Sequence, residues 1–91
     1  MLVRKRLHIT GRVQGVAFRA SAVTATQALS LAGWVANRAD GSVEAVAEGD
    51  EAEVAAFIRW CHSGPPAARV DHVEVTDEPV HGTLPEPFTI R

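Results

Sequence analysis

The stretch from Gly11 to Arg19, GRVQGVAFR, has the residue types of a loop that binds an anion. Gly11 and Gly15 can adopt a positive φ angle, which lets successive backbone N–H groups turn inward around a ligand. Arg19 adds a permanent, forked positive charge at the point where a helix is expected to begin. A cation is mildly unfavourable at a helix N-terminus unless an anion lies opposite it. The stretch therefore favours a site for phosphate or carboxylate.

The alternative for this stretch is an ordinary turn from strand to helix, in which glycine supplies the shape and Arg19 is solvated. A GxxxG spacing occurs often by chance, and it lacks the longer patterns of nucleotide P-loops and dinucleotide-binding folds. The spacing alone favours the turn. The position of the arginine, which is unfavourable for stability, favours the anion site.

The flanking segments predict a strand before the loop and a helix after it. Residues Arg6 to Thr10 alternate polar and apolar, with Leu7 and Ile9 on one face, as a half-buried strand does. Residues Ala20 to Ala32 carry apolar side chains at helical spacing and contain no glycine or proline. The unpaired N–H groups of the helix N-terminus would then face an anion held by the loop.

The next segments predict a glycine stop and a β-hairpin. Gly33 is expected to follow directly after the end of the first helix. The predicted strands 34–39 and 42–48 flank the pair Asp40 and Gly41, which is typical of a tight hairpin turn. Asn37 then lies near the end of the first hairpin strand.

A second helix is predicted to begin at Asp50, with Asp50 as N-cap and Glu53 completing a variant of the capping box. Its buried stripe follows the spacing i, i+3, i+4 and i+7. The residues of that stripe are Val54, Phe57, Ile58 and Cys61. Glycine and proline within residues 63–66 are expected to end the helix.

The remaining elements complete the order β-α-β-β-α-β. A strand over residues 70–76 precedes a loop over 80–87 and a short edge strand over 88–90, whose place in the sheet the sequence leaves open. Two layers satisfy this order: an antiparallel sheet with both helices on one face, the α+β ferredoxin-like arrangement. A right-handed crossover makes the first two strands parallel, with the hairpin partner between them. The anion loop and Asn37 then lie at one edge of the domain, about 10 Å apart.

Length and composition predict one globular domain over residues 1–91. Hydrophobic residues make up 46% of the chain and charged residues 22%, which argues against disorder, and a net charge of −2 argues against nucleic-acid binding by bulk electrostatics. We expect no signal peptide and no membrane span. Cys61 is the only cysteine, so we expect no internal disulfide and a reducing, cytoplasmic location.

Other polar side chains are expected to have no chemical role. The histidines lie on different elements without ligand spacing, so no metal site is expected. They are His8, His62, His72 and His81. The basic residues 4–6 are expected to be a solvated strand start, and Glu44 and Glu48 a solvated strand face.

Three motifs in register resemble the acylphosphatase family: GRVQGVAFR, then GWVANRADGSVE after the first helix, and later GPPAARV. The match covers nearly the whole chain. Two positions depart from the family's pattern, because Ser30 stands where many relatives have glycine and Ala36 precedes Asn37 where a larger polar residue is common. Neither departure is expected to touch the chemistry.

The resemblance implies a hydrolase that cleaves acyl phosphates, the mixed anhydrides of a carboxylic acid and phosphoric acid. It implies that Arg19 is essential and that Asn37 positions the attacking water. The backbone amides implied to hold phosphate are those of Gly15, Val16, Ala17 and Phe18. It implies no cofactor and no metal. The expected partners are a small acyl phosphate and inorganic phosphate as product, without nucleic acid or membrane, and the expected state is a monomer.

Two other functions remain open on the residues alone. A ferredoxin-like binding module would capture an anionic metabolite without turning it over, and Asn37 at the same edge as Arg19 favours the enzyme instead. A nucleic-acid-binding module shares this topology but usually displays aromatic residues on the open sheet face. This chain has His8, Thr10 and Glu74 on the polar strand faces.

Overall fold

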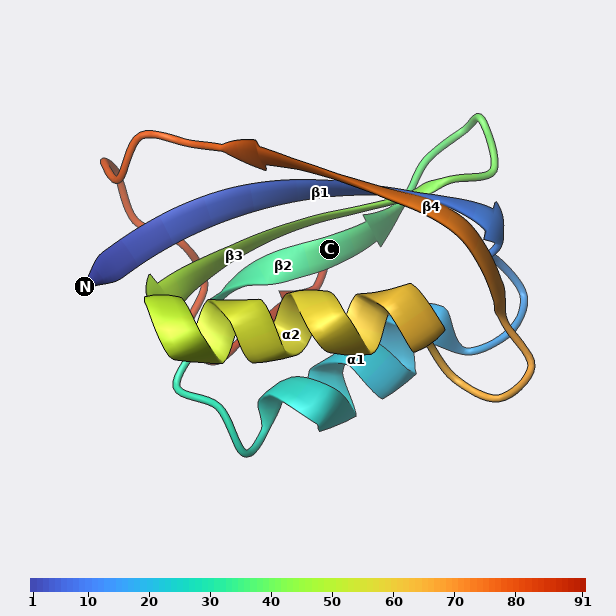
Figure 1. Ribbon diagram of the computed structural model, residues 1–91, viewed down its shortest axis with the longest axis horizontal. Coiled ribbons are helices and arrows are strands. Elements are labelled where there is room, and N and C mark those ends of the chain that lie inside the picture. The colour runs from blue at the N-terminus through green and yellow to red at the C-terminus, as the bar shows by residue number, and fades with distance from the viewer.

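The structure is a computed structural model that describes all of residues 1–91, and it places two helices on one face of a five-stranded sheet (Figure 1). In chain order the elements are β1 (Leu2–Arg12), α1 (Phe18–Thr26), β2 (Ala32–Asn37), β3 (Val43–Asp50), α2 (Glu51–Ser63), β4 (Arg69–Asp77) and β5 (Thr89–Ile90). The strand order across the sheet is β4-β1-β3-β2-β5. The predicted α+β ferredoxin-like class is confirmed. Neither helix is long and apolar enough to cross a membrane.

β3 lies between β1 and β2 and runs antiparallel to both, so β1 and β2 are parallel, as predicted. Ile9 of β1 and Asn37 of β2 are both paired with Val43 of β3, one on each side. The loop after β1 and the end of β2 therefore emerge at the same edge of the sheet, which is the placement that the element order predicts.

The place of β5 in the sheet, which the sequence left open, is seen in the structure. It lies at the sheet edge beside β2 and runs parallel to it, with Val35 opposite Ile90. The sheet is therefore mixed rather than wholly antiparallel. The backbone N–H of Arg91 also donates to the Val35 carbonyl at 2.9 Å, which holds the end of the chain against β2.

The strand side chains that face the helices form one core with the buried face of α2. Leu7 and Ile9 of β1 are fully buried, and the stripe predicted on α2 is buried except at Ile58, which is partly exposed. Burial raises the pKa of the Cys61 thiol, because the thiolate would lose its hydration. Cys61 therefore packs as a small apolar side chain, as predicted.

The first helix is shorter than predicted. α1 ends at Thr26 instead of Ala32, and Gly33 lies inside β2 rather than just after the helix. The hydroxyl groups of Thr24 and Thr26 donate to carbonyls of the preceding turn, and the Leu29 N–H bonds to the Thr26 carbonyl at 3.0 Å. Threonine hydroxyls compete in this way with helical hydrogen bonding, so the helix tightens into a turn.

The start of α2 is confirmed at Asp50, whose carboxylate accepts a hydrogen bond from the Ala52 N–H at 3.3 Å. The capping box is not formed. Glu53 instead accepts from the Ser30 N–H at 3.1 Å, and this bond ties the turn after α1 to α2. Gly64 caps the end of α2, as the Gly-Pro run predicts.

The hairpin between β2 and β3 is confirmed, but its connection is longer than the predicted tight turn. Residues 38–42 form the loop, which the Arg38 N–H closes by donating to the Ser42 carbonyl at 2.8 Å. The Asp40 carboxylate accepts from the backbone N–H and the hydroxyl of Ser42 at 2.9 and 2.5 Å. These bonds stabilise a wider loop than an Asp-Gly turn alone would form.

Gly33, near the start of β2, offers a test of the close packing between β2 and β3. Its φ angle is 139°, and an added Cβ would lie 1.9 Å from the Val46 carbonyl oxygen on β3. We expect Gly33→Ala to lower the free energy of unfolding by about 3 kcal/mol or more, since it adds a clash to backbone strain. Gly41→Ala is the matched control, because Gly41 also has a positive φ but has nothing within 4 Å. Gly41→Ala should lower the free energy of unfolding by about 1 kcal/mol. Urea denaturation of both variants measures the two losses. Equal losses for the two variants would contradict the close approach at Gly33.

Candidate functional site

The loop between β1 and α1 has the backbone shape of an anion-binding nest. Gly15 has a φ angle of 73°, and an added Cβ there would meet nothing within 4 Å. Ala17, the N-cap of α1, has a φ angle of 63° and is the only residue other than glycine with a positive φ. Left-handed residues next to helical ones turn successive N–H groups toward a common point. A strained alanine at this position marks the loop as a functional candidate.

The amides of this loop have no partner within the protein. No backbone N–H from Gly15 to Ala20 donates a hydrogen bond, and the first amide of α1 to do so is that of Ser21, which donates to the Ala17 carbonyl at 3.0 Å. The Ala17 side chain cannot cap the helix, and the first turn of α1 holds no acidic residue. The positive end of α1 is therefore left without a negative charge.

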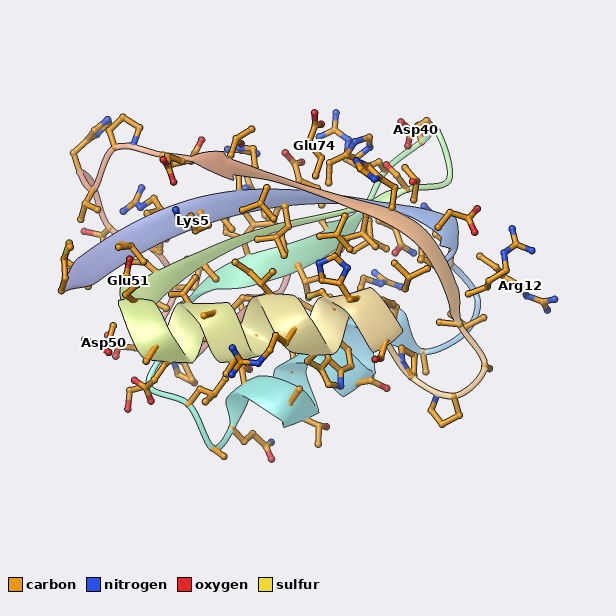
Figure 2. The ribbon with its side chains drawn as sticks, in the orientation of Figure 1. Lys5, Arg12, Asp40, Asp50, Glu51 and Glu74 are labelled. Carbon is orange, nitrogen blue, oxygen red and sulfur yellow. The ribbon has the colours of Figure 1, made fainter.

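The other helix shows that this chain can supply caps where nothing else binds. The Asp50 carboxylate caps α2, and Glu51 and Glu53 lie in its first turn. Figure 2 shows Asp50 and Glu51 together at that helix end. The contrast indicates that α1 is left open for an external anion.

A hollow of about 170 Å³ lies between the N-terminus of α1 and the end of β2; we call it the anion hollow. Its lining residues are Val13, Gly15, Ala17, Phe18, Arg19, Ala20, Asn37 and Ile90. Arg19 is partly buried and makes no ion pair, and the Asn37 side chain makes no hydrogen bond with the protein. A free guanidinium, a free carboxamide and the unpaired amides thus meet in one place.

Most of the predicted site residues come together here. Gly15, Ala17, Phe18, Arg19 and Asn37 all line the anion hollow, whereas the Val16 side chain is buried in the core and does not. Any contribution of residue 16 would come from its backbone amide, which is the part that the sequence prediction named.

Ile90 lines the anion hollow and was not predicted. It reaches the site because β5 pairs in parallel with β2 beside Val35. A two-residue strand carries too little pattern for its partner to be read from sequence, so no signal was available.

Arg12 provides a useful contrast to Arg19. It is exposed, makes no ion pair and points away from the body of the protein at the end of β1 (Figure 2). It does not line the anion hollow. The two arginines flank the same loop, but only Arg19 faces the unpaired amides.

A larger hollow of about 630 Å³ lies between the two helices; we call it the inter-helix groove. Its lining residues are Ala20, Ser21, Thr24, Ala25, Leu29, Ala56, Phe57, Trp60, Gly64, Pro65 and Pro66. None of these side chains is ionisable, so the groove offers no acid, base or charge for catalysis. The anion hollow is therefore the better candidate for chemistry, although it is smaller.

The histidines do not assemble into a ligand set. No group of three or more histidine, cysteine, aspartate or glutamate side chains is placed to hold a metal ion. His8 lies 3.9 Å from the Asp40 carboxylate and 4.0 Å from that of Glu74, on the sheet face away from the helices.

The chain is similar in sequence and in structure to known acylphosphatases. A model of the family described as Acylphosphatase matches residues 5–90. The acylphosphatase of Anaeromyxobacter dehalogenans (strain 2CP-C) is 60% identical over 73 residues, which cover 80% of this chain and 78% of that protein. The acylphosphatase of Anaeromyxobacter sp. (strain Fw109-5) is 51% identical over 90 residues, which cover 99% of this chain and 96% of that protein. The crystal structure of acylphosphatase from Bacillus subtilis superposes with a TM-score of 0.91 at 37% identity, covering 100% of this chain and 99% of that one.

The anion hollow predicts stabilisation by a tetrahedral oxyanion. Inorganic phosphate at ten times its Kd should stabilise the fold by about 1.4 kcal/mol and raise Tm by about 6 °C. Arg19→Ala should remove most of this rise in a thermal melt, because the guanidinium is the only free cation in the hollow.

Arg12→Ala is the control and should keep the full rise, since it removes an equally unpaired charge from the end of β1, next to the same loop, without altering the hollow. An equal loss in both variants would show general charge screening rather than a site.

Proposed function

The chain belongs to the acylphosphatase family, and from this premise we propose that Arg19, Asn37 and the amides of residues 15–18 carry out its reaction. The protein is a hydrolase that cleaves the carboxyl–phosphate bond of an acyl phosphate and releases a carboxylate and inorganic phosphate. The observation that supports the residue roles is the meeting of unpaired amides, an unpaired guanidinium and an unpaired carboxamide in the anion hollow.

The amides and Arg19 would hold the phosphate group. Phosphoryl transfer depends mainly on positioning and on stabilising charge that spreads over the equatorial phosphate oxygens. Backbone N–H groups at the end of α1 and a forked guanidinium supply donors for these oxygens without a negative side chain nearby. A carboxylate is a good leaving group, so the reaction needs no strong general acid.

Asn37 would orient the attacking water. A carboxamide does not take up a proton usefully, so it cannot act as a general base, but it can accept one hydrogen bond and donate another. The water oxygen forms a bond to phosphorus while the bond from phosphorus to the acyl oxygen breaks, and its electron pair leaves with the carboxylate. The proton lost by the water passes to a phosphate oxygen. Fixing the water in line with the breaking bond is the contribution that this residue makes to the rate.

The wider setting is part of the same proposal. We propose that residues 1–91 work as one acylphosphatase domain, as a monomer in the cytoplasm, without metal, cofactor or nucleic acid. The match of the family model to residues 5–90 supports the single domain. The ring of Trp34, on the sheet face away from the helices, is only 7% exposed and has the Arg91 guanidinium 4.4 Å from its centroid, so it offers no platform for a base.

Substitutions of the two side chains should leave different kinetic signatures. Arg19 contacts phosphate before and during the reaction, so Arg19→Ala should weaken phosphate binding and lower turnover together. Arg19→Lys should retain little more phosphate binding or turnover than Arg19→Ala, because an ammonium lacks the planar two-pronged contact. Asn37→Ala should lower kcat by about 100-fold, the scale for one preorganised polar group, while inorganic phosphate still inhibits competitively.

The measurement is steady-state hydrolysis of acetyl phosphate with inorganic phosphate as inhibitor, with Arg12→Ala as the control that should keep wild-type kinetics. Near-normal turnover in Asn37→Ala would contradict the water-positioning role. Loss of phosphate binding in Asn37→Ala as complete as in Arg19→Ala would contradict it as well.

Metal dependence is a separate test. Because no metal enters the proposed steps, we expect hydrolysis of acetyl phosphate to be unchanged after treatment with excess EDTA. A large loss of activity that added Mg²⁺ or Zn²⁺ restores would overturn the metal-free mechanism.

A further inference from the structure

The anion hollow is too small for a substrate whose acyl group is larger than acetyl. Its volume of about 170 Å³ is below the roughly 300–1,000 Å³ of typical ligand pockets. A phosphate group and one water occupy such a space, so an acyl group larger than acetyl must extend beyond it. Three neighbouring hollows each share one residue with the anion hollow. Two of them adjoin each other at Trp34 and Arg91, on the side of β2 and β5, and the third lies between the helices, so the acyl group has two routes.

The first route leads across Asn37 to the sheet face away from the helices. This open-face hollow, about 560 Å³, is lined by Arg6, Trp34, Ala36, Asn37, Arg38, Ala39, Glu44 and Arg91. It is strongly polar, since Glu44 accepts hydrogen bonds from both Arg6 and Arg38. Burial alone would raise the pKa of the Glu44 carboxyl, but these bonds outweigh burial and lower it, so the carboxylate stays charged at neutral pH.

The second route leads along Ala20 into the inter-helix groove, since Ala20 lines both. Figure 1 shows α1 and α2 side by side on the same face of the sheet. The residues that line the groove come from both helices and from the turn after α2. The Phe18 ring lines the anion hollow and lies 5.3 Å from the Trp60 ring, which lines the groove. Trp60 stacks in turn on Phe57 at 6.2 Å. An aromatic surface therefore continues from the hollow into the groove.

The geometry of phosphoryl transfer decides between the routes. The attacking and leaving oxygens lie roughly in line on opposite sides of phosphorus. If Asn37 holds the water, the acyl group must leave on the side away from Asn37. This excludes the open-face hollow and the hollow of about 360 Å³ that adjoins it at Trp34 and Arg91. The remaining route is the groove, whose lining contains no charged side chain.

We propose that the inter-helix groove is the acyl-group subsite and that it selects substrates with an apolar, preferably aromatic, acyl group. The inference rests on the proposed role of Asn37. Ala56 of α2 and Ala25 of α1, both half-buried, line the groove from its two sides. Their small side chains leave the room that a ring requires, and burying an apolar ring against Trp60 would add affinity in proportion to its area.

The test compares benzoyl phosphate with acetyl phosphate by kcat/KM. Ala56→Leu narrows the groove and should lower the ratio of kcat/KM for benzoyl phosphate to kcat/KM for acetyl phosphate about tenfold. The loss should come mainly from a higher KM for benzoyl phosphate. This is the size of effect that a change of one methyl group in an apolar pocket produces. The intrinsic reactivity of the two anhydrides contributes the same factor to this ratio in every variant, so a change in the ratio reports the effect of the substitution. Ala39→Leu makes the same change in the open-face hollow and should leave the ratio as in wild type.

Binding without turnover gives a second measurement that does not depend on Ala56→Leu folding. Benzoylphosphonate should shift the indole N–H NMR signal of Trp60 in the wild type and leave that of Trp34 in place, and acetylphosphonate should shift neither, with Ala25→Leu weakening the benzoyl-induced shift. An unchanged ratio in Ala56→Leu, or a ratio that falls in Ala39→Leu instead, would overturn the subsite. Failure of the catalytic roles would be seen separately, as normal acetyl phosphate turnover in Arg19→Ala or Asn37→Ala.

Discussion

The unsatisfied positive end of α1 is the feature on which the rest of the site depends. The amides from Gly15 to Ala20 make no hydrogen bond within the protein, and Ala17 holds a left-handed conformation that an alanine adopts only at a cost in free energy. A helix end left in this state is destabilising unless a ligand completes it. No side chain caps α1, whereas Asp50 caps α2. The two helix ends therefore differ because of their local sequences and not because of the architecture.

The sheet turns this helix end into a site. Because β3 pairs with β1 on one side and β2 on the other, Val43 fixes Ile9 and Asn37 in one row across the sheet. The loop after β1 and the carboxamide of Asn37 then have a set separation, and Arg19 lines the same anion hollow. Arg19 and Asn37 already border the same hollow as the loop, and such preorganisation is what charge stabilisation requires.

Sequence reasoning succeeded where one residue type had one physical purpose. The glycine-rich loop, Arg19 in an unfavourable place for a cation, and Asn37 at a strand end all follow from conformational freedom, charge and strand order. It failed where several weak preferences competed. The helix after the loop was predicted to reach Ala32, but threonine hydroxyls end it at Thr26.

Pairing between segments that are distant in the sequence was the other feature that could not be predicted from the sequence. Arg4, Glu44 and Glu48 were predicted to be solvated, yet Arg4 is buried and bonds to Glu48 at 2.7 Å, and Glu44 bonds to two arginines. Cross-strand partners depend on the register, which single-strand alternation does not reveal. Ile90 was missed for the same reason, because its place in the site comes from β5 pairing with β2.

The central claim is that the free amides at the start of α1 hold the phosphate group. It is tested most directly by recording backbone amide NMR signals while inorganic phosphate is added to the wild-type protein. The account predicts large, saturable downfield shifts of the N–H signals of residues 15–20, all with one Kd, and small shifts at the exposed N-terminus of α2, which Asp50 caps. Saturable shifts confined to other parts of the chain, with the loop signals unmoved, would contradict it.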